Sequence, residues 1–182
     1  DKAFDDHRRL QSINIPDTVI KIGKSAFNEC TNLQSIVIPS SVTTIGDFAF
    51  CRCYNLQSII ISDSVTKIGN GIFLRCESIQ SIVVAKGNKK YDSRNNCNAI
   101  IETSSNKLIA GCATTQIPDT ITQIGARAFG HSNSLYSVFI PNSVTKIEDG
   151  AFHSFADSCD LLYIEVAEGN NRYDSRNNCN SI

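Results

Sequence analysis

The chain contains 182 residues, 41% of them hydrophobic, and carries a formal net charge of −1. It has no basic run interleaved with aromatic residues, and no apolar run approaches the roughly 18 residues that span a bilayer, so we expect neither a nucleic-acid partner nor membrane insertion in this segment. Because the sequence has no Met and no signal peptide and starts inside a repeat, we expect it to be a piece of a longer chain.

From residue 10 onward the sequence repeats every 23 residues. Sliding it by this period superimposes Leu10 on Leu33 and Leu56, and it also superimposes a column of Phe and a column of Cys. A fixed period of 20–29 residues is typical of a solenoid, in which each coil contacts only its neighbours. The repeated rings are then expected to stack along the axis: Phe27, Phe50, Phe73, Phe129 and Phe152.

A single coil shows how the repeat should fold. The spacing L-x-x-I-x-I from Leu33 to Ile38 predicts a short strand with alternate residues facing inward, and Pro39 ends it. Gly46 is expected to adopt positive φ in a tight bend, and Phe50 to lie in a short helical or 3₁₀ segment. The predicted fold is a β-rich leucine-rich-repeat solenoid, a right-handed superhelix of coils of about 23 residues with two short strands and one helical turn each.

The regular pattern breaks once and then begins to break again. After residue 85 a polar segment leads into two apolar runs around a Thr-Ser-Ser-Asn loop, which predicts a hairpin. The segment Tyr91–Asn98 recurs unchanged as Tyr173–Asn180, so the interruption is itself repeated. The predicted organisation is one solenoid domain, 1–182, with regular coils at 10–85, a variant coil with a hairpin insertion at 86–115, regular coils at 116–164 and the start of a second variant coil at 165–182.

The repeated run I-P-x-S-V-T-x-I-G-x-x-A-F-x-x-C-x-x-L-x-S-I resembles the leucine-rich repeat of the BspA-like family of bacterial and protozoan surface proteins. The insertion from Tyr91 to Cys112 is similar to the variant coil of such proteins from gut bacteria. The resemblance covers essentially the whole chain. It implies a secreted or cell-surface protein, adhesion to host matrix proteins in some relatives, and no catalytic activity or cofactor.

Candidate catalytic chemistry is sparse. The three histidines, His7, His131 and His153, are scattered and lie in no Ser-His-Asp or Cys-His pattern, so we predict no catalytic residues and no enzyme. The loop 92–98 is rich in Asp and Asn oxygens that suit Ca²⁺, but Arg94 sits in its middle and the ligand spacing is wrong. We therefore favour a turn stabilised by its own side chains and predict no metal site.

The eight cysteines allow several interpretations. Cys30, Cys53 and Cys76, which we call the cysteine column, occupy one position of successive coils. Their side chains would run parallel rather than toward each other, and three in a row cannot all pair. No C-x-x-C spacing typical of structural zinc occurs. We favour buried free thiols over disulfides.

The outward-facing side of the predicted strands carries the strongest functional signal. The residue between the two inward positions is apolar in three consecutive coils, and an aromatic residue follows after the hairpin insertion, which can divide this stripe. Contiguous exposed apolar surface marks interaction sites, whereas β-branched residues also simply favour strands, and both interpretations stay open. The predicted binding residues are Val37, Ile60, Val83, Phe139, Ser35, Ser58, Ser81 and Ser137.

The sequence leaves two functions open. The first is an extracellular, adhesin-like module that binds a host or matrix protein, or a glycan, through the strand face. The second is a structural spacer that holds another domain away from the cell and binds nothing itself. We expect a monomer in either case.

Overall fold

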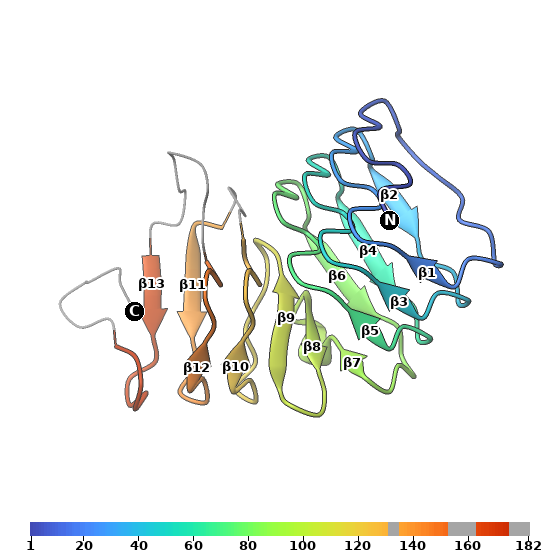
Figure 1. Cartoon of the computed structure of the whole chain (residues 1–182). Coiled ribbons are helices and arrows are strands. Elements are labelled where there is room, and N and C mark those ends of the chain that lie inside the picture. The colour runs from blue at the N-terminus through green and yellow to red at the C-terminus, as the bar shows by residue number, and fades with distance from the viewer. Residues whose placement is uncertain (131–134, 153–162, 175–182) are drawn as a thin grey trace.

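The computed structural model describes residues 1–130, 135–152 and 163–174 (Figure 1). Regular coils have a short strand on a back face and, except in the coils that begin at Leu10 and Gln116, a longer strand on a front face, as the sequence predicted. The front strands are β2 (Ser35–Val37), β4 (Ser58–Ile61), β6 (Ser81–Val84), β11 (Ser137–Ile140) and β13 (Tyr163–Val166), and the back strands are β1 (Lys21–Ile22), β3 (Thr44–Ile45), β5 (Lys67–Ile68), β10 (Gln123–Ile124) and β12 (Lys146–Ile147).

Successive coils lie directly on one another, because their strands pair in parallel and in register. In the front sheet β2-β4-β6, Ile36 pairs with Ile59 and Ile59 with Ile82, and all three side chains are buried. The back sheet β1-β3-β5 repeats this arrangement, with Ile22 and Ile45 as one of its pairs. The predicted leucine-rich-repeat solenoid is therefore confirmed.

The third side of each coil, which we call the turn edge, is a chain of turns and not the helical segment that the sequence predicted. Around Phe50, the neighbours Phe48 and Arg52 have φ values of +56° and +59°. Left-handed residues interrupt a helix, so alternate N–H groups of this segment bond outside their own coil. The N–H groups of Phe48, Phe50 and Arg52 donate to carbonyls of the next coil at 3.0, 3.0 and 2.7 Å. These bonds offset the left-handed conformation, which costs about 1–2 kcal/mol per residue.

Phenylalanine rings stack inside the turn edge. The centroid of Phe50 lies 5.5 Å from that of Phe27 and 6.0 Å from that of Phe73, with the rings within 24° of parallel. Phe129 and Phe152 form a second stack, 5.2 Å apart. The expected stacking is confirmed within each stack. A single continuous spine was the wrong expectation, because no stacked ring pair among the described residues joins Phe73 to Phe129.

The repeated glycines serve a different purpose from the one predicted. None of Gly23, Gly46 and Gly69 has positive φ. A Cβ added at Gly46 would instead lie 2.6 Å from the backbone nitrogen of Lys24 in the preceding coil. The glycine column therefore permits close coil-to-coil approach and does not relieve a strained bend.

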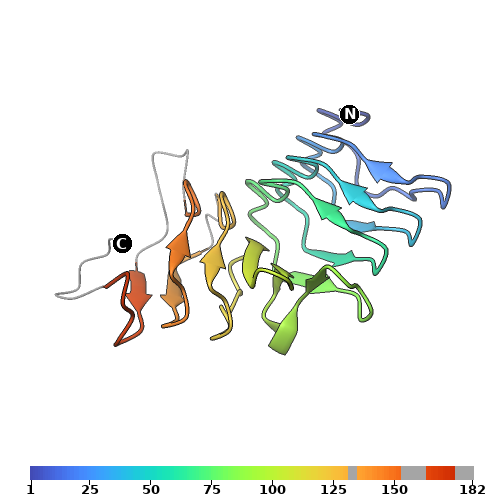
Figure 2. The same cartoon turned by 60° about the horizontal axis from the view of Figure 1, so that its bottom comes forward.

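The variant coil contains β7 (Tyr91–Asp92), the 3₁₀ helix η1 (Arg94–Asn96), β8 (Ala99–Glu102) and β9 (Lys107–Gly111). β8 and β9 pair antiparallel, which is the hairpin that the sequence predicted. The second back sheet runs through it in the order β12-β10-β9-β8-β7. Figures 1 and 2 show that the direction of the front strands changes across this hairpin.

The hairpin separates two hydrophobic cores. Ile100 and Ala110 pack into the core of the preceding coils, whereas Ile101 and Leu108 pack into the core of the following coils. On β8, Ile100 and Ile101 leave the strand on opposite faces by ordinary alternation. On β9, Leu108 and Ala110 are two residues apart and would share a face, but a register shift opposite Ile100 and Ile101 adds a residue to this strand and places the two side chains in different cores. Of the second variant coil predicted at 165–182, residues 175–182 lie outside the described residues.

Candidate binding face

The front sheet presents three apolar side chains in one line. Val37 pairs with Ile60, and Ile60 pairs with Val83, so the three occupy one position of successive strands. Their side chains are 78%, 59% and 41% exposed, respectively. Neighbouring strands lie about 4.8 Å apart, which makes the three a continuous surface. We call Val37, Ile60 and Val83 the apolar stripe; the predicted outward orientation is confirmed.

Polar side chains border the apolar stripe. Ser35 pairs with Ser58 and Ser58 with Ser81, so the serines form a parallel row on the same sheet. Ser35 and Ser58 are exposed and Ser81 is half-buried. A row of exposed Gln side chains precedes the serines, and the sequence-based prediction did not include it although each Gln directly precedes a Ser: Gln34, Gln57 and Gln80.

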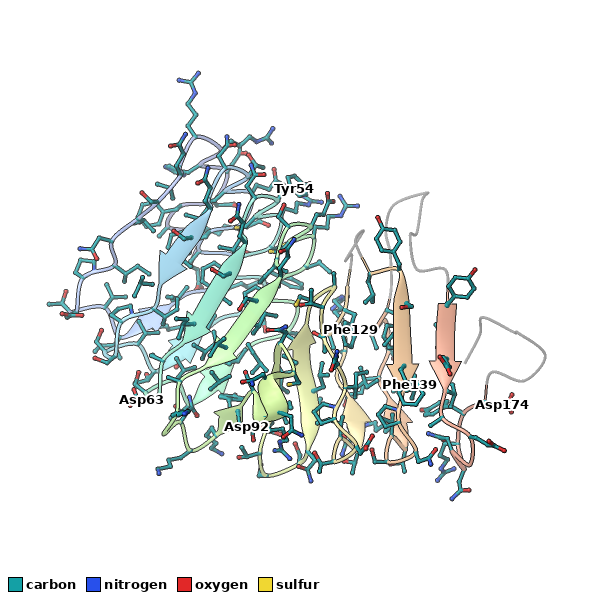
Figure 3. The ribbon with its side chains drawn as sticks, turned by 180° about the vertical axis from the view of Figure 1, so that it is seen from behind. Tyr54, Asp63, Asp92, Phe129, Phe139 and Asp174 are labelled. Atoms are coloured by element: carbon teal, nitrogen blue, oxygen red, sulfur yellow. The ribbon has the colours of Figure 1, made fainter. Side chains whose placement is uncertain are left out.

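A second, aromatic surface lies on β11 and β13, after the hairpin. Phe139 is 48% exposed and pairs with Glu165, while Ser137 pairs with Tyr163 (Figure 3). Tyr136 and Tyr163 are 61% and 63% exposed. We call Tyr136, Phe139 and Tyr163 the aromatic cluster. Because β6 and β11 belong to different sheets, Phe139 is separated from the apolar stripe.

The sequence-based prediction missed both tyrosines of the aromatic cluster. Tyr136 stands where regular coils have Gln34, and Tyr163 stands where they have Ser35. These two positions lie beside the residue between the two inward positions, and the prediction of apolar or aromatic binding residues considered only that residue in each coil. The available signal was an aromatic residue replacing a polar one in an otherwise constant column.

The loop considered for a cation is closed by its own side chains. Arg94 binds both carboxylate oxygens of Asp92, with Nε to Oδ1 at 2.9 Å and Nη2 to Oδ2 at 2.7 Å. Ser93 donates to the carbonyl of Ala99 at 2.7 Å. Within the described ranges no group of three His, Cys, Asp or Glu side chains could hold a metal ion. This geometry is that of a structural turn.

The cysteine column is buried and unbonded to other cysteines, as predicted. Each thiol donates to the carbonyl of the Phe in the preceding coil, as Cys53 does to Phe27 at 3.2 Å and Cys76 to Phe50 at 3.0 Å. Burial raises the pKa of the Cys30 thiol to about 12. The hydrogen-bonded thiols therefore stabilise the turn edge, and burial makes Cys30 a poor nucleophile.

The histidines do not converge on any described site. His7 is exposed at the N-terminal end, with its ring 5.7 Å from that of Phe4 in an edge-to-face contact. His131 and His153 lie outside the described residues. No helix in the described part of the chain is long and apolar enough to cross a membrane.

These features define a repeat protein: a β-solenoid with a buried ladder of rings and thiols and a flat, partly apolar front face. A family model described as a BspA type leucine rich repeat region matches residues 1–106 and 110–179 in six copies. The chain therefore belongs to the BspA-type leucine-rich repeat family. No curated protein matched the chain.

Solved structures share this fold. A leucine-rich cell surface protein from Faecalibacterium prausnitzii A2-165 superimposes with a TM-score of 0.74 at 28% identity, over 96% of this chain and 44% of that one. The pneumococcal vaccine antigen PcpA gives 0.71 at 21% identity, over 87% and 39% of the two chains. A leucine-rich repeat protein from Bacteroides ovatus ATCC 8483 gives 0.58 at 24% identity, over 93% and 46%. The chain thus spans less than half the length of each.

Proposed function

We propose that this chain is a non-catalytic, protein-binding module of a secreted or cell-surface protein, and that it engages a host or matrix protein through its front face. The apolar stripe is the observation that carries the proposal, because three exposed aliphatic side chains lie in register on one flat sheet. The surface location is supported by the cell-surface description of the protein from Faecalibacterium prausnitzii.

The front face has the physical properties of a protein-binding surface. Its side chains are held by paired backbones, so binding orders few additional groups and loses little conformational entropy. The apolar stripe is bordered by serine hydroxyls, and a central apolar patch with a polar rim is the usual anatomy of an interface. The apolar stripe and the serine row continue over three coils, so they can contact a partner segment in an extended conformation.

The aromatic cluster favours a second candidate, binding of a glycan. Three exposed rings stand beside the carboxylate of Glu165 and the hydroxyl of Ser137. Aromatic faces pack against the C–H faces of sugar rings, while carboxylates and hydroxyls bond to sugar hydroxyls. The spacer function remains the alternative in which neither surface has a ligand.

The decisive test compares two double variants of the apolar stripe in a binding assay against immobilised extracellular matrix proteins and a glycan array. Ile60→Asp with Val83→Asp should abolish protein binding, because the exposed apolar contact is replaced by charge. Ile60→Thr with Val83→Thr keeps β-branched side chains and should weaken binding at least about tenfold, since desolvation of apolar anchors dominates interface energy. Glycan binding should survive both changes.

The matched control adds the same net charge on the opposite face. Thr44→Asp with Lys67→Ala changes the charge by −2, as the Asp pair on the stripe does, but lies on β3 and β5 of the back sheet. It should leave binding unchanged, and far-ultraviolet circular dichroism should show all variants folded. A folded Asp variant that binds as well as the wild type would contradict binding through the apolar stripe, and a wild-type chain that binds neither protein nor glycan would leave the spacer function.

A further inference from the structure

The regular coils before the hairpin are joined at the turn edge by three backbone hydrogen bonds in addition to their two sheets. The N–H groups of Ser25, Phe27 and Glu29 donate to carbonyls of the next coil at 2.9, 2.8 and 2.9 Å. The following coil repeats the pattern around Phe50 at 3.0, 3.0 and 2.7 Å. Nearest-neighbour connections of this kind determine how cooperatively a solenoid unfolds.

This connection is interrupted where the variant coil enters. The repeat pattern would direct the Phe73 N–H to the carbonyl of Ala128. That oxygen instead accepts a hydrogen bond from the Gly111 N–H of the hairpin, at 2.9 Å. At the next position of the pattern a long hydrogen bond is formed, from the N–H of Arg75 to the carbonyl of Gly130 at 3.4 Å.

Both sheets of the N-terminal coils end at side-chain hydroxyls and not at another strand. Tyr91 Oη accepts from the N–H of Ile68 at the edge of β5, at 3.1 Å. Ser93 Oγ accepts from the N–H of Val84 at the edge of β6, at 2.9 Å. A hydroxyl satisfies an edge N–H without offering a further row of backbone groups, which is how a strand ladder can be terminated.

The second variant coil repeats the same closure. Asn88 donates to two carbonyls of the preceding coil at 2.9 Å each, and its Oδ1 accepts from the N–H of Tyr91 at 2.9 Å. Asn170 donates to two carbonyls at 2.9 and 3.1 Å, and its Oδ1 accepts from the N–H of Tyr173 at 3.0 Å. Tyr173 Oη then accepts from Ile147 in β12 at 2.9 Å.

A side-chain contact also crosses the first variant coil. The guanidinium of Arg127 lies 5.8 Å from the centroid of the Phe48 ring, and the two faces of the hairpin belong to different cores. No strand pair among the described residues joins the coils before residue 86 to those after it. The interface between the two sets of coils therefore differs in kind from the interfaces within them.

We propose that the variant coil is an internal cap, which closes the block of coils before it and divides the solenoid into separately cooperative folding blocks. The N-terminal block comprises residues 1–85, and the described residues of the C-terminal block are 116–130 and 135–152. Opening of one block leaves the front face of the other intact, whatever that face binds. The inference does not depend on the proposed function.

Hydrogen–deuterium exchange of the full chain, read by mass spectrometry, tests the division. Phe129→Ala should accelerate exchange of β10 and β12 at least about tenfold and leave β2 to β6 within about twofold, because the lost packing lies in one core only. Phe50→Ala should give the reverse. Equal acceleration of both blocks in either variant would overturn the proposal.

A second measurement keeps the test decisive if either alanine variant does not fold. The wild-type chain in increasing urea should show two distinct opening transitions, and a single common transition would contradict separate blocks. Tyr91→Phe removes one closing hydroxyl and should accelerate exchange of the Ile68 amide but not that of Ile147. Tyr173→Phe is the matched control and should do the opposite; unchanged exchange in both would exclude the capping role.

Discussion

Replacing Phe50 with alanine tests the stacked core most directly. The side chain is fully buried and lies between two rings, 5.5 Å from Phe27 and 6.0 Å from Phe73. Removing a buried Phe side chain costs about 3–5 kcal/mol through lost transfer energy and the remaining cavity. The close packing of paired coils limits collapse into that cavity, so we expect the upper part of the range.

Urea unfolding followed by circular dichroism gives the measurement, since the chain contains no Trp for fluorescence. Phe4→Ala is the control, because Phe4 is only half-buried and stacks on a single ring, 5.2 Å away. Its loss should be clearly smaller. A double variant with Phe27→Ala should show a coupling of about 0.5–1.5 kcal/mol between the rings. A loss below about 1 kcal/mol for Phe50→Ala would refute the buried stack.

Further predictions concern the hairpin, the thiols and acid stability. Gly111→Ala should destabilise the chain by about 1–3 kcal/mol in the same urea assay, because the added Cβ would lie 2.4 Å from the Phe129 ring. The cysteine column should resist alkylation at pH 8 in the native chain and react fully in denaturant without reductant, as measured by intact mass; protection as disulfides would contradict this. Lys107 lowers the pKa of Glu148, so the contact stabilises the fold above the ordinary pKa of 4.5 and is lost as pH falls through the lower folded value. Glu148→Gln should therefore flatten the acid side of a stability–pH profile.

Periodicity predicted the parts of the fold that depend on which residues face inward. The buried Ile36 and Ile38 and the outward Val37 follow from strand alternation, and the hairpin follows from two apolar runs around a polar loop. The turn edge could not be predicted in this way. Its left-handed residues include Phe48 and Arg52, types without a preference for positive φ, and the hydrogen bonds that stabilise them come from the next coil.

The predictions of positive φ at the repeated glycines and of one continuous stack of Phe rings were wrong for a related reason. A glycine in a repeat is compatible with positive φ or with close approach, and only the position of the preceding coil decides between them. The break between Phe73 and Phe129 depends on where the hairpin is inserted, because its strands occupy the space between two coils. The apolar stripe was predicted residue by residue, whereas Tyr136 and Tyr163 stand in the flanking columns outside that row.

The residues that lie between the two inward positions of each coil show that strand propensity alone does not account for the apolar stripe. Asn14 and Gln116 occupy this position where no strand is formed, which is consistent with a preference of strands for β-branched residues. Glu165, however, occupies the same position within β13 and pairs in register with Phe139. A front strand in this chain therefore forms with a charged outward residue. Strand formation therefore does not require an apolar residue at this position in three consecutive coils, and a contiguous exposed apolar row is the physical argument for a binding surface.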